Sequence, residues 1–209
     1  MKNVLLVGDS IRIGYDKSVK ASLEGIANVV FPAENCKFAA YLLRYFHEYK
    51  KALLKDEDVD VVHFNAGLWD CLRLLGEDPH TPIDFYAYYI ERLCIRIKKV
   101  CPNAKVIFAT STKVISEKML PGFKRYNEDI EAYNKVAIDI VKKYGFEVND
   151  LYTLSTKVPE EAHSDAVHYY TELGTEIFTN QVLEHVCKAL EIEPVSYVGK
   201  LHTDKPIGY

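Results

Sequence analysis

Three side chains in this sequence have the types and the order needed for nucleophilic catalysis by a serine. Ser10 follows the apolar run Val4–Val7 and a glycine, Gly8, near the start of the chain. Asp165 and His168 stand three residues apart toward its other end. A serine hydroxyl is a weak nucleophile at neutral pH unless an imidazole removes its proton and a carboxylate orients that imidazole. The sequence therefore predicts Ser10 as nucleophile, His168 as general base and Asp165 as the group that orients the base.

The elements that must position these residues can be read from the alternation of apolar runs with stretches of helical spacing. The predicted strands are residues 3–7, 28–31, 59–65, 105–110 and 145–150. The predicted helices are residues 13–24, 38–54, 84–100, 127–144 and 171–190. This alternation is typical of an α/β fold with a parallel sheet that is covered by helices on both faces.

Such a sheet brings the ends of its strands to one edge. Ser10 follows the first predicted strand, Asn65 ends the third, and residues 150–164 form an aperiodic loop that leads to Asp165 and His168. In doubly wound sheets the ligand site lies at the carboxyl ends of the strands. We therefore expect all four side chains to meet at this edge.

With these residues in place, the sequence resembles the SGNH (GDSL-like) hydrolases, and in particular their carbohydrate and acetyl esterase members. The resemblance rests on Gly8-Asp9-Ser10, on an asparagine and a glycine after the third strand, and on Asp165-x-x-His168. It implies a flavodoxin-like three-layer α/β/α sandwich with a five-stranded parallel sheet, which we place at residues 1–193. It also implies ester hydrolysis with Ser10, His168 and Asp165 in the roles given above, without cofactor or metal.

The oxyanion donors are where the chain departs from the family pattern. The family's usual third block is Gly-x-Asn-Asp, whereas residues 67–70 here read Gly-Leu-Trp-Asp, with Trp69 in the place of the asparagine. We expect Asn65, two residues before Gly67, to supply the missing donor through Nδ2, although it could instead cap the turn after the strand. The family's glycine after the second strand is also absent, so the N–H of Cys36 is expected to replace it beside the N–H of Ser10.

Three residues near the predicted site are candidates for substrate binding: Arg12, Gly67 and Trp69. Trp69 either stacks on a sugar ring or fills the core, and Arg12 either binds a substrate oxygen or is a solvated arginine at the start of a helix. Bulky Leu68 and Trp69 leave little room for an acyl group. We therefore expect a small-molecule or carbohydrate ester substrate with an acetyl group, with a lipid ester or thioester as the alternative.

Two other classes of function remain as alternatives. His163, Asp165 and His168 have the ligand types that zinc or manganese accepts, but a catalytic metal needs further ligands, and Ser10 and Asn65 are poor ones. A non-catalytic flavodoxin-like module, either a phospho-receiver or a flavin carrier, would leave Asp165 and His168 unexplained. A serine after a strand is also a common helix N-cap, and its combination with Asp165 and His168 favours the nucleophile.

The composition of the chain limits the kinds of partner that it is expected to bind. The chain has 209 residues and a net charge of -4, without the cluster of Lys and Arg expected of a nucleic-acid-binding protein. No apolar stretch reaches membrane-spanning length, and the five scattered cysteines contain no Cys-x-x-Cys pair, which predicts reduced thiols in a cytoplasmic protein. The polar tail, residues 194–209, is expected to lie along the surface or across a second subunit, which leaves a homo-oligomer open.

Overall fold

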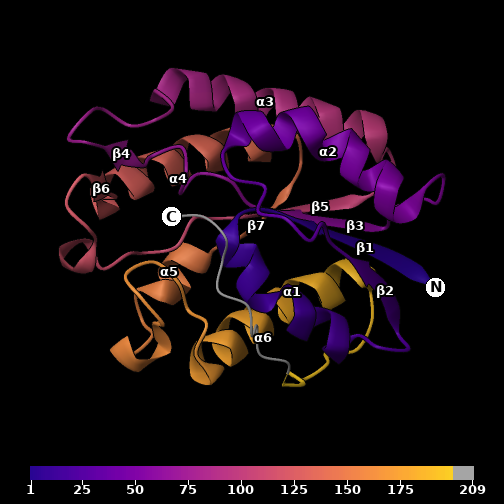
Figure 1. Cartoon of the computed structure of the whole chain (residues 1–209). Coiled ribbons are helices and arrows are strands. Elements are labelled where there is room, and N and C mark those ends of the chain that lie inside the picture. The colour runs from indigo at the N-terminus through magenta and orange to yellow at the C-terminus, as the bar shows by residue number, and fades with distance from the viewer. Residues whose placement is uncertain (200–209) are drawn as a thin grey trace.

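The structure, a computed structural model, describes residues 1–199 of the chain, which are built around a five-stranded parallel sheet (Figure 1). Its strands are β1 (Lys2–Val7), β2 (Ala27–Val30), β3 (Val61–Phe64), β5 (Lys105–Ala109) and β7 (Glu147–Asn149). Their spatial order is β2-β1-β3-β5-β7, and each neighbouring pair is parallel. The predicted five-stranded parallel sheet is confirmed.

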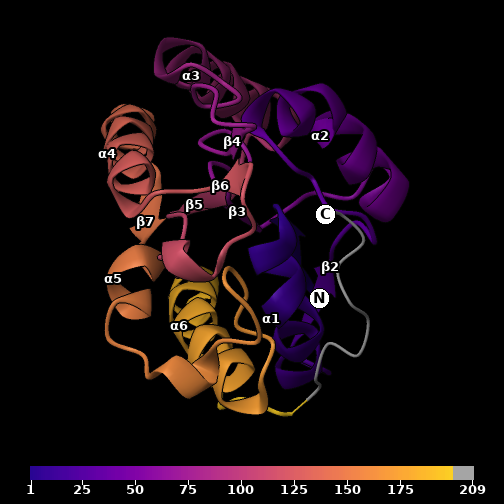
Figure 2. The same cartoon turned by 60° about the vertical axis from the view of Figure 1, so that its left-hand side comes forward.

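Helices cover both faces of this sheet. Figures 1 and 2 show α2 (Ala39–Leu54), α3 (Ile83–Val100) and α4 (Asn127–Lys143) on one face. They show α1 (Ser10–Ser22) and α6 (Glu172–Leu190) on the other, with the short α5 (Leu151–Ser155) on the same side. The three-layer α/β/α sandwich predicted from the sequence is therefore confirmed.

The sheet's interior explains why the first strand reads as one continuous apolar run. Val4–Val7 is fully buried, because β1 has a strand on either side and a helix layer on each face. Val4 is paired with Val29 of β2 and with Val61 of β3. Strands covered on both faces need apolar side chains at every position rather than at alternate positions. This packing fixes the point where β1 ends and therefore the place of Ser10.

Several short elements were not predicted. β4 (Arg73–Leu74) and β6 (Phe123–Lys124) form a separate antiparallel pair, which lies beside α4 in Figures 1 and 2. Two 3₁₀ helices, η1 (Ser116–Lys118) and η2 (Glu160–Ala162), and the helix α5 lie in segments without a clear period. The expectation of a loop over residues 150–164 is thus only partly right, since this segment contains α5 and η2.

The segment after α6 packs against α1. Residues 194–199 form no helix or strand, and the N–H of Val198 donates to Ser22 Oγ, 2.9 Å away, at the end of α1. The rest of the predicted tail, residues 200–209, lies outside the described residues.

All five cysteines are buried free thiols. Among the helices of residues 1–199, none has the length and apolar character needed to cross a bilayer.

Candidate active site

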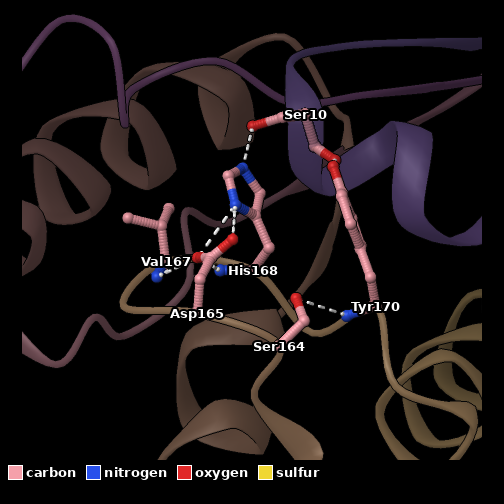
Figure 3. Close-up of polar contacts among 6 residues, drawn as sticks. All are labelled: Ser10, Ser164, Asp165, Val167, His168 and Tyr170. Carbon is pink, nitrogen blue, oxygen red and sulfur yellow. Dashed lines mark hydrogen bonds and ion pairs between the residues drawn. The ribbon is translucent and has the colours of Figure 1, made fainter. Parts of the chain in front are cut away.

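Ser10, His168 and Asp165 form a continuous hydrogen-bonded chain (Figure 3). Ser10 Oγ lies 2.8 Å from His168 Nε2, and His168 Nδ1 lies 2.8 Å from Asp165 Oδ2. Ser10 and His168 are each only 5% exposed, whereas Asp165 is half-buried. The structure therefore brings together the three residues that the sequence singled out, in the order hydroxyl, imidazole, carboxylate. An arrangement of this kind can draw a proton from the hydroxyl as its oxygen attacks a carbonyl carbon.

The turn between β1 and α1 places Ser10 at the start of a helix. Asp9 is the N-cap of α1, and its Oδ1 accepts the N–H of Ile11 at 2.9 Å. The sequence analysis placed this helix start at residue 13, three residues too late, because it did not assign the cap to Asp9. As the first residue of the helix, Ser10 has a backbone N–H without an intrahelical acceptor, at the end of the helix that favours negative charge.

Gly8 is required at this turn by a close approach. A Cβ at this position would lie 1.8 Å from Asn65 Oδ1. No side chain is compatible with that distance unless Asn65 moves. The glycine before Asp9 and Ser10 therefore lets the loop after β3 contact the loop after β1.

The turn that contains Asp165 and His168, the candidate catalytic turn, is held by its own backbone. Asp165 Oδ1 accepts the N–H groups of Val167 and His168 at 2.8 and 2.9 Å, and the N–H of Ser164 donates to the carbonyl of His168. Burial opposes the charge on Asp165. The hydrogen bonds from the His168 side chain and the two N–H groups outweigh it, so the pKa of this carboxyl lies well below its usual value. Asp165 is therefore a fixed anion beside the imidazole.

Tyr170 is a site residue whose role the sequence analysis missed. Its ring stacks on the His168 imidazole with centroids 4.8 Å apart, and its hydroxyl donates to the carbonyl oxygen of Ser10. A Cβ at Gly14 would lie 2.6 Å from the Tyr170 ring, so this glycine admits the ring against α1. In the sequence, a glycine one helical turn after Ser10 hints that another group packs closely against α1. Only the three-dimensional structure shows that this group is the Tyr170 ring.

Asn65 is tied to Asp9, the residue that precedes Ser10. Its Nδ2 donates to Asp9 Oδ1 at 2.8 Å, and the side chain is buried. An amide has two N–H groups, so one remains to donate elsewhere. Burial raises the pKa of Asp9, and the hydrogen bond from Asn65 opposes this rise. The interpretation of Asp9 as a residue that ties down the loop by hydrogen bonds agrees with these contacts.

Two expected site residues have other partners in the structure. The N–H of Cys36 donates to the carbonyl oxygen of Gly8 at 3.1 Å, so the prediction that it serves as an oxyanion donor is wrong. Arg12 is 1% exposed and forms a buried ion pair with Asp16. It also donates to the carbonyl oxygens of Pro32, Gly8 and Glu34. Arg12 is thus neither a solvated arginine nor available to a substrate, because these contacts anchor the loop after β2 against α1.

Gly67 and Trp69 occupy the loop after β3. Gly67 has φ +147°, and a Cβ there would lie 2.5 Å from Ser111 Oγ, which accounts for the glycine by backbone geometry. Trp69 is half-buried, and the Arg125 guanidinium carbon lies 5.8 Å from the centre of its ring.

Asp70 joins this loop to the helix layer. Its carboxylate oxygens lie 3.0 and 3.3 Å from the N–H of Ala39, the first residue of α2, and its carbonyl accepts the N–H of Thr81. Burial raises the pKa of Asp70 to about 7, although hydrogen bonds from Ala39 and Thr81 act in the opposite direction. In the folded chain this carboxyl therefore binds its proton more tightly than in the unfolded chain.

The substitution Asp70→Asn is expected to flatten the pH dependence of stability. As pH rises from about 4 to about 7, the folded wild type retains the Asp70 proton that the unfolded chain releases. The contribution of Asp70 to the free energy of unfolding then falls by at most about 1.4 kcal/mol per pH unit. Urea unfolding at several pH values measures this slope, with Asp139→Asn on the exposed face of α4 as control. Equal slopes in the wild type and Asp70→Asn would contradict the assignment.

His163 does not join the other two residues proposed as metal ligands. Its ring packs against Tyr169, with centroids 4.1 Å apart. Over residues 1–199, no three side chains of His, Cys, Asp or Glu converge in the arrangement of a metal site. The hydrogen-bonded chain from Ser10 to Asp165 is thus the arrangement at this edge of the sheet that could carry out catalysis.

No protein-family model and no curated protein matches this chain. Solved structures do match it. The lipase/acylhydrolase from Enterococcus faecalis superposes with a TM-score of 0.71 and 20% identity, over 93% of this chain and 98% of that chain. A GDSL-like lipase from Bacteroides thetaiotaomicron superposes with a TM-score of 0.69 and 18% identity, over 90% of this chain and 89% of that chain.

An acetylxylan esterase from Geobacillus stearothermophilus also matches, with a TM-score of 0.67 and 17% identity, over 88% of this chain and 94% of that chain. The likeness to these three proteins extends along nearly the whole of each chain. The chain therefore has the three-layer α/β/α fold of GDSL-like lipases, acylhydrolases and acetylxylan esterases, as its resemblance to the SGNH hydrolases predicted.

Proposed function

We propose that this protein is a serine ester hydrolase. The observation that carries the proposal is the alignment of Ser10 Oγ, the two ring nitrogens of His168 and the Asp165 carboxylate, with both hydrogen bonds at 2.8 Å. The names of the structural neighbours, which include lipases, acylhydrolases and acetylxylan esterases, point to the same reaction class. A phospho-receiver or flavin carrier would have no use for this constellation.

The reaction follows from the geometry. Ser10 Oγ attacks the ester carbonyl carbon while His168 Nε2 takes the hydroxyl proton, and Asp165 stabilises the imidazolium that forms. The proton then passes from His168 to the departing alkoxide, which leaves an acyl group on Ser10. Water, activated by the same imidazole, attacks this acyl-enzyme and releases the acid. Each proton taken by His168 is returned within one half of the cycle, so the enzyme regains its starting state.

The negative charge that develops on the carbonyl oxygen must be stabilised by hydrogen-bond donors near the start of α1. We assign this role to the Ser10 N–H and to the second N–H of Asn65 Nδ2. The Asp9 carboxylate accepts the other N–H of Asn65 Nδ2 and so sets the orientation of the amide. Donors fixed in this way stabilise charge without reorganising during the reaction.

The substitution Asn65→Ala is therefore expected to lower kcat about a hundredfold or more, with little change in KM. The amide's contribution grows as charge develops on the oxygen, so it stabilises the transition state rather than the bound ester. Steady-state kinetics on a model ester measure both constants, and thermal unfolding reports whether the fold is kept. An effect confined to KM would contradict the assignment and would mean that Asn65 holds the substrate.

For the substrate, we propose an ester of a small acyl group, acetyl in the first instance, with carbohydrate as the alcohol component. Buried Leu68 and half-buried Trp69 stand three and four residues after Asn65, and we expect these bulky side chains to limit the space beside the proposed oxyanion donors. A lipid ester or a thioester remains the alternative with the same mechanism. Rates on model esters with acyl chains from acetyl to octanoyl, followed by acetylated sugars, test this. Octanoyl esters hydrolysed faster than acetyl esters would overturn the small-acyl assignment.

A further inference from the structure

A cavity of about 230 Å³ lies directly beside the candidate active site. Its lining is mainly apolar, with Met119, Leu120, Phe123, Ala166 and Val167, and also contains the charged residues Lys118 and Asp165, the latter a member of the proposed triad. No part of the reaction described above uses the apolar residues of this lining. Apolar clefts and cavities with a few polar groups are where proteins bind small ligands.

The cavity has one wall in common with the catalytic turn. Asp165, Ala166 and Val167 are the three lining residues that precede His168 closely in the sequence. In Figure 3 the Val167 side chain and the Tyr170 ring lie on opposite sides of the imidazole. Tyr170 stacks on the ring and covers one side of His168, and Val167, which lies on the other side in this view, lines the cavity.

The opposite wall is built by the segment after β5. This segment is tied to the catalytic turn, since the N–H of Ile115 donates to the carbonyl of Ala166 at 2.8 Å. Lys124 Nζ bridges the carbonyl oxygens of Ser116 and Met119 at 3.1 and 2.8 Å, which closes the segment on itself. The cavity is thus framed by hydrogen-bonded backbone and is a built feature of the fold.

The direction of the reaction decides which half of the ester faces this cavity. The carbonyl oxygen must point to the donors at the start of α1, on the Ser10 and Asn65 side. The ester oxygen must come within hydrogen-bond reach of His168 Nε2, because that nitrogen returns the proton to the leaving alkoxide. The alcohol part therefore extends from Ser10 toward the His168 side, where the Asp165–Val167 wall of the cavity lies.

We infer that this cavity binds the alcohol part of the ester and selects alcohols with an apolar surface next to the ester oxygen. The inference rests on the proposed function and refines it. Such an alcohol is an alkyl or aryl alcohol, or a sugar that carries an apolar group at this position. Each methylene buried against the lining improves kcat/KM about three- to fourfold, until the cavity is full.

Two matched ester series test the inference. The first holds the acyl group at acetyl and lengthens the alcohol from methanol to hexanol. The second holds the alcohol at methanol and lengthens the acid from acetate to hexanoate. Unactivated primary alcohols leave with similar chemical ease, so the change along the first series reports binding. We expect kcat/KM to rise with each carbon of the alcohol and to stay level or fall with each carbon of the acid.

A pair of variants assigns the effect to the cavity. Leu120 is 67% exposed and lines it, whereas Leu75 is 84% exposed on the turn after β4 and lies outside the lining. Leu120→Asp should remove the rise along the alcohol series, because an alkyl chain would then meet a charge. Leu75→Asp adds the same charge to the same part of the surface and should leave the rise unchanged. Neither residue belongs to the proposed catalytic machinery.

The outcomes separate this inference from the proposed function. A flat alcohol series, a steep acid series, or equal effects of the two Leu→Asp variants would overturn the assignment of the cavity while leaving the ester hydrolase intact. Absence of hydrolysis along both series would overturn the proposed function itself, and the inference with it.

Discussion

Replacement of Ser10 by alanine is expected to abolish ester hydrolysis, with a loss of about 10⁴-fold to 10⁶-fold in kcat and no loss of the fold. The substitution removes the attacking oxygen and one hydrogen bond, that to His168 Nε2. It keeps the backbone N–H at the start of α1, and alanine is well tolerated in a helix. Hydrolysis of a model ester, with circular dichroism and thermal unfolding alongside, measures both expectations.

Ser22→Ala is the matched control for this substitution. Ser22 lies at the other end of α1, where its hydroxyl accepts the N–H of Val198. The control variant should keep wild-type kinetics. If Ser10→Ala turned over ester at a rate near that of the wild type, another group would have to be the nucleophile.

The substitution His168→Ala is expected to lower kcat about as much as Ser10→Ala, and the double variant should be scarcely worse than either single one. Members of a triad act as a unit, so the second loss removes a function that is already gone. In this structure the imidazole links the Ser10 hydroxyl to the Asp165 carboxylate. Single and double variants assayed on the same ester measure this lack of additivity.

His163→Ala is the matched control here, because this histidine lies in the same loop and packs on Tyr169 instead of joining the triad. Its substitution should leave kcat nearly unchanged, and so should treatment of the wild type with a chelator. Multiplicative losses in the double variant would show that Ser10 and His168 act independently. Loss of activity in His163→Ala or on chelation, restored by zinc or manganese, would favour the metal-based alternative.

The parts of this structure that were predictable from the sequence are those specified by neighbouring residues. A fully buried parallel strand such as β1 has a continuous apolar run, and Asp165-x-x-His168 is close enough in sequence for one turn to join its two side chains. In a doubly wound sheet the carboxyl ends of the strands share one edge. This rule predicts Ser10, Asn65 and His168 at the same edge of the sheet.

The errors arose where contacts between distant segments decide the role of a residue. Arg12 was expected to be solvated or to bind substrate. It is instead held by backbone carbonyl groups of the loop after β2 in addition to Asp16, and a sequence pattern does not show such backbone contacts. The N–H of Cys36 was assigned to the oxyanion because nothing in the sequence shows that the Gly8 carbonyl accepts it. β4 and β6 are two residues each, which is too short to produce a detectable period.

Tyr170 is the residue with the most consequence among those missed. Its ring stacks on the His168 imidazole, and its hydroxyl contacts the Ser10 carbonyl at the same time. The first contact joins Tyr170 to His168, two residues before it in the chain. The second joins Tyr170 to Ser10, 160 positions away. A sequence pattern can suggest the first, but only the packing of α1 against the loop before α6 reveals the second.

The central claim, that His168 activates Ser10 as a nucleophile, is tested most directly by covalent labelling with an organophosphonate that reacts with activated serines. We expect one phosphonyl group per chain, located by peptide mass spectrometry on Ser10. We also expect no such label in Ser10→Ala and a greatly slowed reaction in His168→Ala. Labelling at another residue, or equally fast labelling of Ser10 in His168→Ala, would show that His168 does not activate Ser10 as the nucleophile.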